Sequence, residues 1–267
     1  MSDTADPLDD FEARIVTYDG ETRTVFRKGE GPGVIVISEI PGITPAVADF
    51  ARRVVDLGCT VAMPSLFGTP GKPVSVPYAV SSLVGACVSK EFATWAAGRT
   101  SPVTVWLRHL SRDLHDELGG PGVGVVGMCL TGGFALAMMV DDEVVAPVLS
   151  QPSLPFPVGA RRKADLGISA DDLARVKERV DEGICVLGLR FTGDPVMPAD
   201  RFATLRRELG DGFVGVEIDS SKGNPHGIPT NAHSVLTEHL VDEPGHPTHD
   251  ALNQVLDLFR ERLLTDA

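Results

Sequence analysis

Short apolar runs rich in β-branched residues alternate with helical patterns along most of this chain. Both faces of these runs are apolar, which is typical of strands that lie inside a parallel sheet. Such a sheet needs helices on both faces, so we predict an α/β fold with a mostly parallel central sheet, in a single domain over residues 1–267. The predicted strands are 33–38, 60–63, 123–126, 144–149, 184–190 and 213–218, preceded by a hairpin at 12–28 with its turn at Asp19-Gly20, and the predicted helices are 45–57, 101–117, 131–140, 169–182, 198–209 and 249–264.

Three segments lack such a pattern. Residues 1–10 are acidic and polar, and we expect them to form a flexible leader. Residues 65–85 are rich in Pro, Gly and Ser and predict a long loop. Because long loops in α/β domains often carry function, we expect this loop to border the functional site. A second irregular stretch, rich in proline, covers 152–158.

The charge balance and the cysteines limit the environment and the partners. The chain has 24 basic and 37 acidic residues, a net charge of −13 that disfavours binding to nucleic acid or to an anionic membrane. The first residues lack the features of a signal peptide, and no apolar run is long enough to span a bilayer. The four cysteines form neither a CxxC pair nor a zinc pattern. We therefore expect a cytoplasmic protein with no metal and no cofactor, and the sequence leaves its oligomeric state open.

The most informative segment is a strand-to-helix junction, GVGVVGMCLTGGFA, at residues 122–135. It places Cys129 in a turn of small residues between a buried strand and an apolar helix. Such a turn exposes a nucleophile above the sheet, and the N–H groups of the following helix can stabilise a thiolate and a developing oxyanion. A dinucleotide-binding loop fits poorly, because its glycines would follow the strand. The alternative is that Cys129 is only a small core residue.

Four segments, in the same order along the chain, resemble the dienelactone hydrolase family. They are GVIVISEIPGI at 33–43, GMCLTGG at 127–133, TGDPVMPA at 192–199 and NPHGI at 224–228. The resemblance implies the α/β-hydrolase fold. It also implies hydrolysis of a small-molecule ester or lactone through a Cys-His-Asp triad and an acyl-enzyme intermediate, without a cofactor.

The sequence also departs from the pattern of this family. Thr131 stands where the family usually has glycine, and Pro41 stands where it usually has an aromatic residue. The residues after 228 do not match the family pattern. These departures bear on the elbow around Cys129 and on the assignment of the histidine.

The order of nucleophile, acid and histidine in α/β-hydrolases directs the search for the other two catalytic residues. Asp194 directly follows a predicted strand, at the edge where such sheets bind ligands, and Asp219 is the alternative acid. For the base, the resemblance favours His226 in NPHGI. His233 and His246 are alternatives, because they also lie in the loop region after the last strand.

Two other histidines, His239 and His249, are predicted to lie at solvated or helical positions. The resemblance further assigns a role to Glu39, since the matching glutamate of the family contacts the resting cysteine and helps to activate it. A buried, unpaired carboxylate would otherwise be costly, so a salt bridge or a protonated acid is the ordinary outcome at such a position. The backbone N–H groups of Ile40 and Leu130 are expected to form the oxyanion hole.

The sequence leaves the substrate and the type of reaction open. Arginines hold the carboxylate of the substrate in the resembled family, but Arg99, Arg161 and Arg162 cannot be matched to them and only flank irregular segments. A thioesterase or another acyl hydrolase could use the same triad. A redox sensor could keep the fold and use Cys129 without catalysis, and a pseudoenzyme could lack the base.

Overall fold

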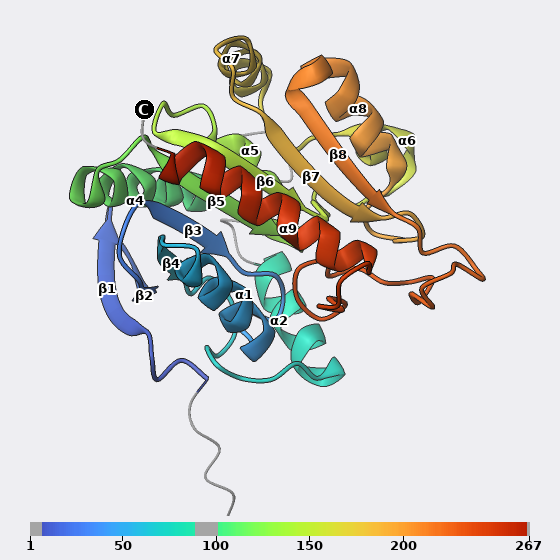
Figure 1. Ribbon diagram of the computed structural model, residues 1–267, viewed down its shortest axis with the longest axis horizontal. Coiled ribbons are helices and arrows are strands. Elements are labelled where there is room, and N and C mark those ends of the chain that lie inside the picture. The colour runs from blue at the N-terminus through green and yellow to red at the C-terminus, as the bar shows by residue number, and fades with distance from the viewer. Residues whose placement is uncertain (1–6, 89–100, 266–267) are drawn as a thin grey trace, which may run out of the picture.

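One sheet of eight strands, in the order β1-β2-β4-β3-β5-β6-β7-β8, forms the centre of the protein (Figure 1). The computed structural model describes residues 7–88 and 101–265, with side chains left out at 85–88. Neighbouring strands from β4 to β8 are parallel, whereas β2 runs antiparallel to both β1 and β4. The strands are β1 (Glu12–Tyr18), β2 (Glu21–Lys28), β3 (Gly33–Ile37), β4 (Thr60–Pro64), β5 (Val123–Met128), β6 (Val144–Ser150), β7 (Val186–Phe191) and β8 (Phe213–Ile218).

Helices cover both faces of this sheet, as the apolar runs predict. Along β3, Val34 and Val36 belong to one core and Ile35 and Ile37 to the other, because successive side chains of a strand point to opposite faces. Helices α1 and α9 supply the first core and lie in front of the sheet in Figure 1, whereas α4, α5, α7 and α8 supply the second. The helices are α1 (Pro45–Asp56), α2 (Val76–Val88), α4 (Pro102–Leu118), α5 (Gly132–Met138), α6 (Gly159–Ala164), α7 (Ala170–Asp181), α8 (Ala199–Leu209) and α9 (Pro247–Phe259).

Local sequence explains where several elements begin and turn. Thr44 caps α1 by accepting a hydrogen bond from the backbone N–H of Val47, and Pro45 occupies the first turn, where its missing N–H costs nothing. Asp19 and Gly20 take positive φ values of 52° and 83° in the turn between β1 and β2. This confirms the predicted hairpin at 12–28, since tight hairpin turns favour such residues.

The segment 65–85 differs from its prediction as one long loop. Helix α2 begins at Val76, so the second half of the segment is helical. The Pro and Ser content was misleading because Pro77 lies in the first helical turn, a position that tolerates proline. Side chains from both halves, Leu66, Phe67 and Leu83, pack in the same core as Leu130 of the elbow.

The predicted acidic leader at 1–10 is described only from residue 7 onward. Leu8 is buried, and the Asp10 carboxylate accepts hydrogen bonds from Lys28 at 2.6 Å and from Arg52 at 2.8 Å. These last residues therefore pack onto the fold instead of extending from it. In the ranges 7–88 and 101–265, no helix combines the length and the apolar character needed to cross a bilayer.

Candidate active site

The carboxyl ends of the parallel strands bring the predicted site residues to one edge of the sheet. Glu39 follows β3, Cys129 follows β5 and Asp194 follows β7. The segment between β8 and α9 returns to this edge with His233. This is the edge where open α/β sheets bind ligands, and the loops at the strand ends build the site.

The turn around Cys129 has the geometry of a nucleophile elbow. Cys129 has a φ of +56°, a backbone conformation that residues other than glycine rarely adopt. A Cβ atom on Gly127 would lie 2.2 Å from the carbonyl oxygen of Thr131, and one on Gly132 would lie 2.6 Å from the Cα of Pro152. The small residues are therefore required for the chain to turn this sharply.

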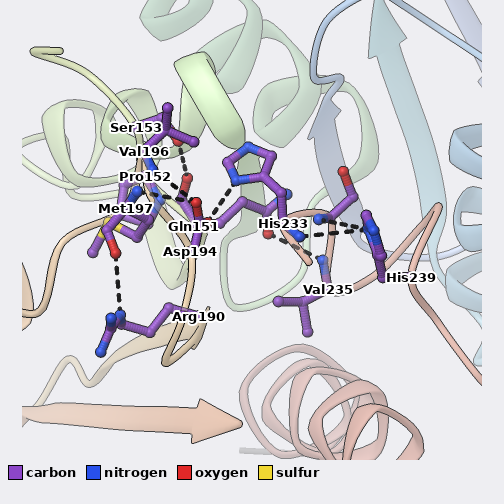
Figure 2. Close-up of polar contacts among 12 residues, drawn as sticks. Gln151, Pro152, Ser153, Arg190, Asp194, Val196, Met197, His233, Val235 and His239 are labelled. Atoms are coloured by element: carbon purple, nitrogen blue, oxygen red, sulfur yellow. Dashed lines mark hydrogen bonds and ion pairs between the residues drawn. The ribbon is translucent and has the colours of Figure 1, made fainter. Parts of the chain in front are cut away.

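Asp194 and His233 form a pair in which the Asp194 side chain is fully buried and the His233 side chain is partly buried (Figure 2). Oδ2 of Asp194 lies 2.6 Å from Nδ1 of His233. Oδ1 of the same carboxylate accepts hydrogen bonds from the backbone N–H groups of Val196 at 2.9 Å and Met197 at 3.2 Å. One carboxylate oxygen is thus fixed by its own turn, and the other is free to orient the imidazole.

Arg190 holds the loop that carries Asp194. Its guanidinium donates hydrogen bonds to the backbone oxygens of Met197 at 3.3 Å and Thr192 at 3.1 Å, on either side of the acid. It also pairs with Glu217 on the neighbouring strand β8. Because Arg190 is 3% exposed, this is an internal brace that fixes the acid loop to the sheet.

The second ring nitrogen of His233, Nε2, is on the side of the ring that interacts with Cys129. With Nδ1 bonded to Asp194, Nε2 is the ring nitrogen left for chemistry, and it is buried. Burial lowers the pKa of His233, but the negative charge of a Cys129 thiolate and the bond to Asp194 oppose burial and raise that pKa overall. Cys129, His233 and Asp194 therefore interact as one electrostatic unit, in which the imidazolium form is favoured.

The predicted pairing of His226 with Asp194 is wrong. Residues 224–228 close a tight turn, in which the Asn224 side chain bonds both the N–H and the C=O of Ile228, at 2.9 and 2.7 Å. Ile228 is buried, which leaves His226 exposed at the tip of the turn, with its ring 5.3 Å from that of His246. The small residues of NPHGI thus serve the turn and do not present a base.

The two remaining alternatives from the sequence also lie away from this pair. His246 caps α9, where its Nδ1 accepts a hydrogen bond from the backbone N–H of Thr248. Asp219 is exposed and accepts a hydrogen bond from the backbone N–H of Ser221 at 2.8 Å. Of the alternatives left open by the sequence, the structure brings His233 to Asp194.

The prediction that His239 lies at a solvated or helical position is wrong, because the residue is half-buried in a segment without helix and supports the site. Its Nδ1 accepts hydrogen bonds from the backbone N–H groups of Ser234 at 3.2 Å and His233 at 3.5 Å (Figure 2). Its ring packs edge-on against Phe191. Burial lowers the pKa of His239, which favours the neutral ring needed to accept these bonds. No local pattern signals this role, because the contact depends on how the segment folds back on itself.

Glu39 lies buried between three loops, but its partners differ from the expected one. It is 3% exposed and accepts hydrogen bonds from Ser234 at 2.6 Å, from Thr237, and from the Gln151 amide at 3.3 Å. These are its hydrogen-bond partners in the part of the chain that the structure describes, and Cys129 is not among them. The carboxylate is therefore satisfied by neutral donors, and it ties the end of β3 to the segment that carries His233.

Gln151 connects the same network to β6. It is fully buried with a φ of +36°, a second non-glycine residue in a rare conformation at this edge. Its side-chain oxygen accepts hydrogen bonds from Ser150 and from the backbone N–H of Val235 at 3.4 Å. A strained backbone conformation persists only where surrounding contacts stabilise it. Here the contacts of Gln151 also connect β6 to the segment that carries His233.

The remaining predicted residues are the two expected oxyanion donors and three arginines. Leu130 is buried and Ile40 is half-buried, and their backbones directly follow Cys129 and Glu39. Arg161 and Arg162 are exposed on α6, and Arg99 lies outside the described residues. In ranges 7–88 and 101–265, no three His, Cys, Asp or Glu side chains are grouped so that they could hold a metal ion.

The strand order, the helices on both faces and the cysteine elbow define a protein of the α/β-hydrolase fold. Comparison with known proteins narrows this class. The sequence matches the dienelactone hydrolase family over residues 21–263, and the chain belongs to that family. It is therefore a hydrolase of carboxylic esters or lactones.

Individual relatives are distant. The chain is 26% identical over 202 residues to the "Putative carboxymethylenebutenolidase" of Saccharomyces cerevisiae, which covers 72% of this chain and 69% of the yeast protein. A "Putative Dienelactone Hydrolase" from Klebsiella pneumoniae subsp. pneumoniae has a similar structure, with a TM-score of 0.62, 20% identity, and coverage of 94% of this chain and 99% of the other. A dienelactone hydrolase-like promiscuous phosphotriesterase from metagenomic libraries also has a similar structure, with a TM-score of 0.58 and 18% identity. The match covers 95% of this chain and 99% of the other. At these identities the solved structures support the fold.

Proposed function

We propose that Cys129, His233 and Asp194 are the catalytic triad with which this chain hydrolyses a small-molecule ester or lactone. The observation that carries the proposal is the partly buried His233, bonded through Nδ1 to Asp194 and coupled electrostatically through its other side to Cys129. A nucleophile, a base within reach and an acid that orients the base are what acyl transfer needs. The name of the yeast relative supports a lactone as the substrate class.

The geometry suggests the following sequence of steps. The Cys129 thiolate attacks the carbonyl carbon, and the N–H groups of Ile40 and Leu130 stabilise the oxyanion of the tetrahedral intermediate. Its collapse breaks the bond to the leaving oxygen, which takes a proton from the His233 imidazolium. Neutral His233 then accepts a proton from water, which attacks the thioester and releases the acid and the thiolate. Asp194 keeps the ring oriented throughout.

We propose that Glu39 serves this reaction by fixing the position of the histidine segment. Its carboxylate holds Ser234, directly after His233, and Thr237 three residues further on. Gln151 adds a link to β6. Since catalytic groups lose efficiency when their position shifts by a fraction of an ångström, such an anchor contributes to the rate without touching the substrate.

Two substitutions at Glu39 separate this anchor from a role of its charge. In Glu39→Gln, the amide oxygen still accepts from Ser234 and Gln151, and the Thr237 hydroxyl can rotate to accept from the amide nitrogen. We expect kcat/KM within about threefold of the parent protein for this variant. Glu39→Ala leaves buried donors without partners, at about 1–3 kcal/mol each, and should lose at least about tenfold in kcat/KM.

The measurement is the hydrolysis of a p-nitrophenyl ester, with the melting temperature of each variant recorded alongside. If Glu39→Gln loses as much activity as Glu39→Ala while remaining folded, the negative charge itself is needed. Direct activation of the cysteine would then replace the anchoring role.

The proposed function is tested by trapping the acyl-enzyme. A p-nitrophenyl ester should give a burst of nitrophenol equal to the enzyme concentration, and mass spectrometry of the quenched protein should find the acyl group on Cys129. Iodoacetamide at pH 6–7 should label the same residue. Labelling without ester turnover would favour a redox sensor, and failure of both would favour a pseudoenzyme, so either result would overturn the proposal.

The cysteines also bear on where the protein acts. Cys59, Cys129 and Cys185 are free thiols in the described part of the chain. We propose a cytoplasmic site of action, because reducing compartments keep thiols reduced and a thiol nucleophile is active only in the reduced form.

A further inference from the structure

Thr131 is a fully buried polar residue in the elbow that the proposed mechanism does not use. It lies two residues after the nucleophile, at the start of α5. Its hydroxyl points back towards the sheet and meets backbone groups of two different strands. A β-branched residue in so tight a turn therefore needs a specific explanation.

The hydroxyl of Thr131 joins the ends of β5 and β3. Oγ1 accepts a hydrogen bond from the backbone N–H of Met128 at 2.9 Å. Its single hydrogen faces the carbonyl oxygens of Met128 at 2.8 Å, Ile37 at 2.9 Å and Ser38 at 3.3 Å. One side chain thus satisfies polar groups at the point where two neighbouring strands separate.

The position of this hydroxyl follows from the register of the sheet. The last paired residues of the two strands are Ile37 and Gly127, so Met128 and Ser38 lie just beyond the paired part of β5 and β3. Thr131 Oγ1 bonds backbone groups at this point, where the pairing of the two strands ends. Gly127 makes room for this arrangement, because a Cβ atom there would lie 2.2 Å from the Thr131 carbonyl oxygen.

We propose that Thr131 is a positioning residue that sets the distance between the two halves of the oxyanion hole. Met128 immediately precedes Cys129 and Leu130, and Ser38 lies two residues before Ile40. The hydroxyl therefore couples the backbone segment that carries one oxyanion donor to the segment that carries the other. This inference rests on the proposed function, since the oxyanion hole is part of that mechanism.

The test compares Thr131→Val with Thr131→Ser. Valine keeps the shape of the side chain and removes the hydroxyl, whereas serine keeps the hydroxyl and removes only a methyl group. Two reactions of Cys129 are measured in each variant. Acylation by a p-nitrophenyl ester passes through an oxyanion, but alkylation by iodoacetamide does not.

For Thr131→Val we expect the acylation rate and kcat to fall about 10- to 100-fold, with KM changed less than about threefold and the alkylation rate unchanged. Thr131→Ser should restore acylation to within about threefold of the parent protein. Circular dichroism and the melting temperature establish that both variants are folded.

Other outcomes overturn the inference. Equal losses of acylation and alkylation in Thr131→Val would show that Thr131 acts on the thiol itself, and unchanged acylation would show that the hydroxyl is dispensable. Failure of the proposed function would look different, because the parent protein would then show no acylation of Cys129. If Thr131→Val does not fold and Thr131→Ser loses acylation alone, a hydroxyl is not sufficient, and the inference is again wrong.

Discussion

Replacing Cys129 with alanine is expected to abolish ester hydrolysis while leaving the protein folded. Removal of a nucleophile costs about 10⁴-fold or more, because the remaining groups cannot form the acyl intermediate. Cys129 is only partly buried, and alanine adopts its positive φ at no greater cost than cysteine does. The melting temperature should therefore stay within a few degrees of that of the parent protein. Turnover of a p-nitrophenyl ester and a thermal melt are the two measurements.

Cys185 offers the matched control. It is also a free, partly buried cysteine, but it directly precedes β7, at the edge of the sheet opposite the elbow. Cys185→Ala should retain the turnover of the parent protein. If Cys129→Ala kept its activity, the cysteine mechanism would be refuted, whatever the result at Cys185.

His233→Ala should produce a loss of similar size. General acid and base catalysis contributes about 10²- to 10⁴-fold, and in the proposed mechanism one histidine serves both steps. Its loss also removes the partner of a buried carboxylate, since the Asp194 side chain is fully buried. We expect at least about a thousandfold decrease in kcat/KM.

His226→Ala is the control for this substitution, because His226 is exposed in a neighbouring turn of the same segment. It should retain most of the turnover, and so should His246→Ala, which affects the start of α9. A pattern in which His226→Ala is inactive and His233→Ala is active would mean that the segment rearranges when substrate binds. The triad would then have to be reassigned.

Most of the fold could be predicted from the sequence, because its signals are local. Each predicted strand is present to within about two residues, since buried parallel strands are continuous apolar runs bounded by turns. The helix α2 was missed because Pro77 reads as a loop residue, although it is tolerated in a first turn. The α6 helix was missed because one and a half turns carry no periodic pattern.

The site could be predicted only where it follows a regular element. The elbow at Cys129 and the acid Asp194 each come directly after a strand, so the sheet fixes them at a common edge. His233 lies in the long segment 219–246, which contains no strand or helix, and its position depends on contacts with Glu39, Gln151 and His239. Nothing local in NAHSV distinguishes it from NPHGI.

The proposed nucleophile and the proposed base are therefore held in very different ways. Strand β5 is paired on both sides, with β3 and β6, in the middle of the sheet, whereas His233 depends on side-chain bonds in an irregular segment. Protein regions open locally according to how many contacts hold them, so the histidine segment is the part of the site that can detach while the sheet stays intact. A local opening of this segment would therefore remove the proposed base and leave the Cys129 thiol in place at the end of β5.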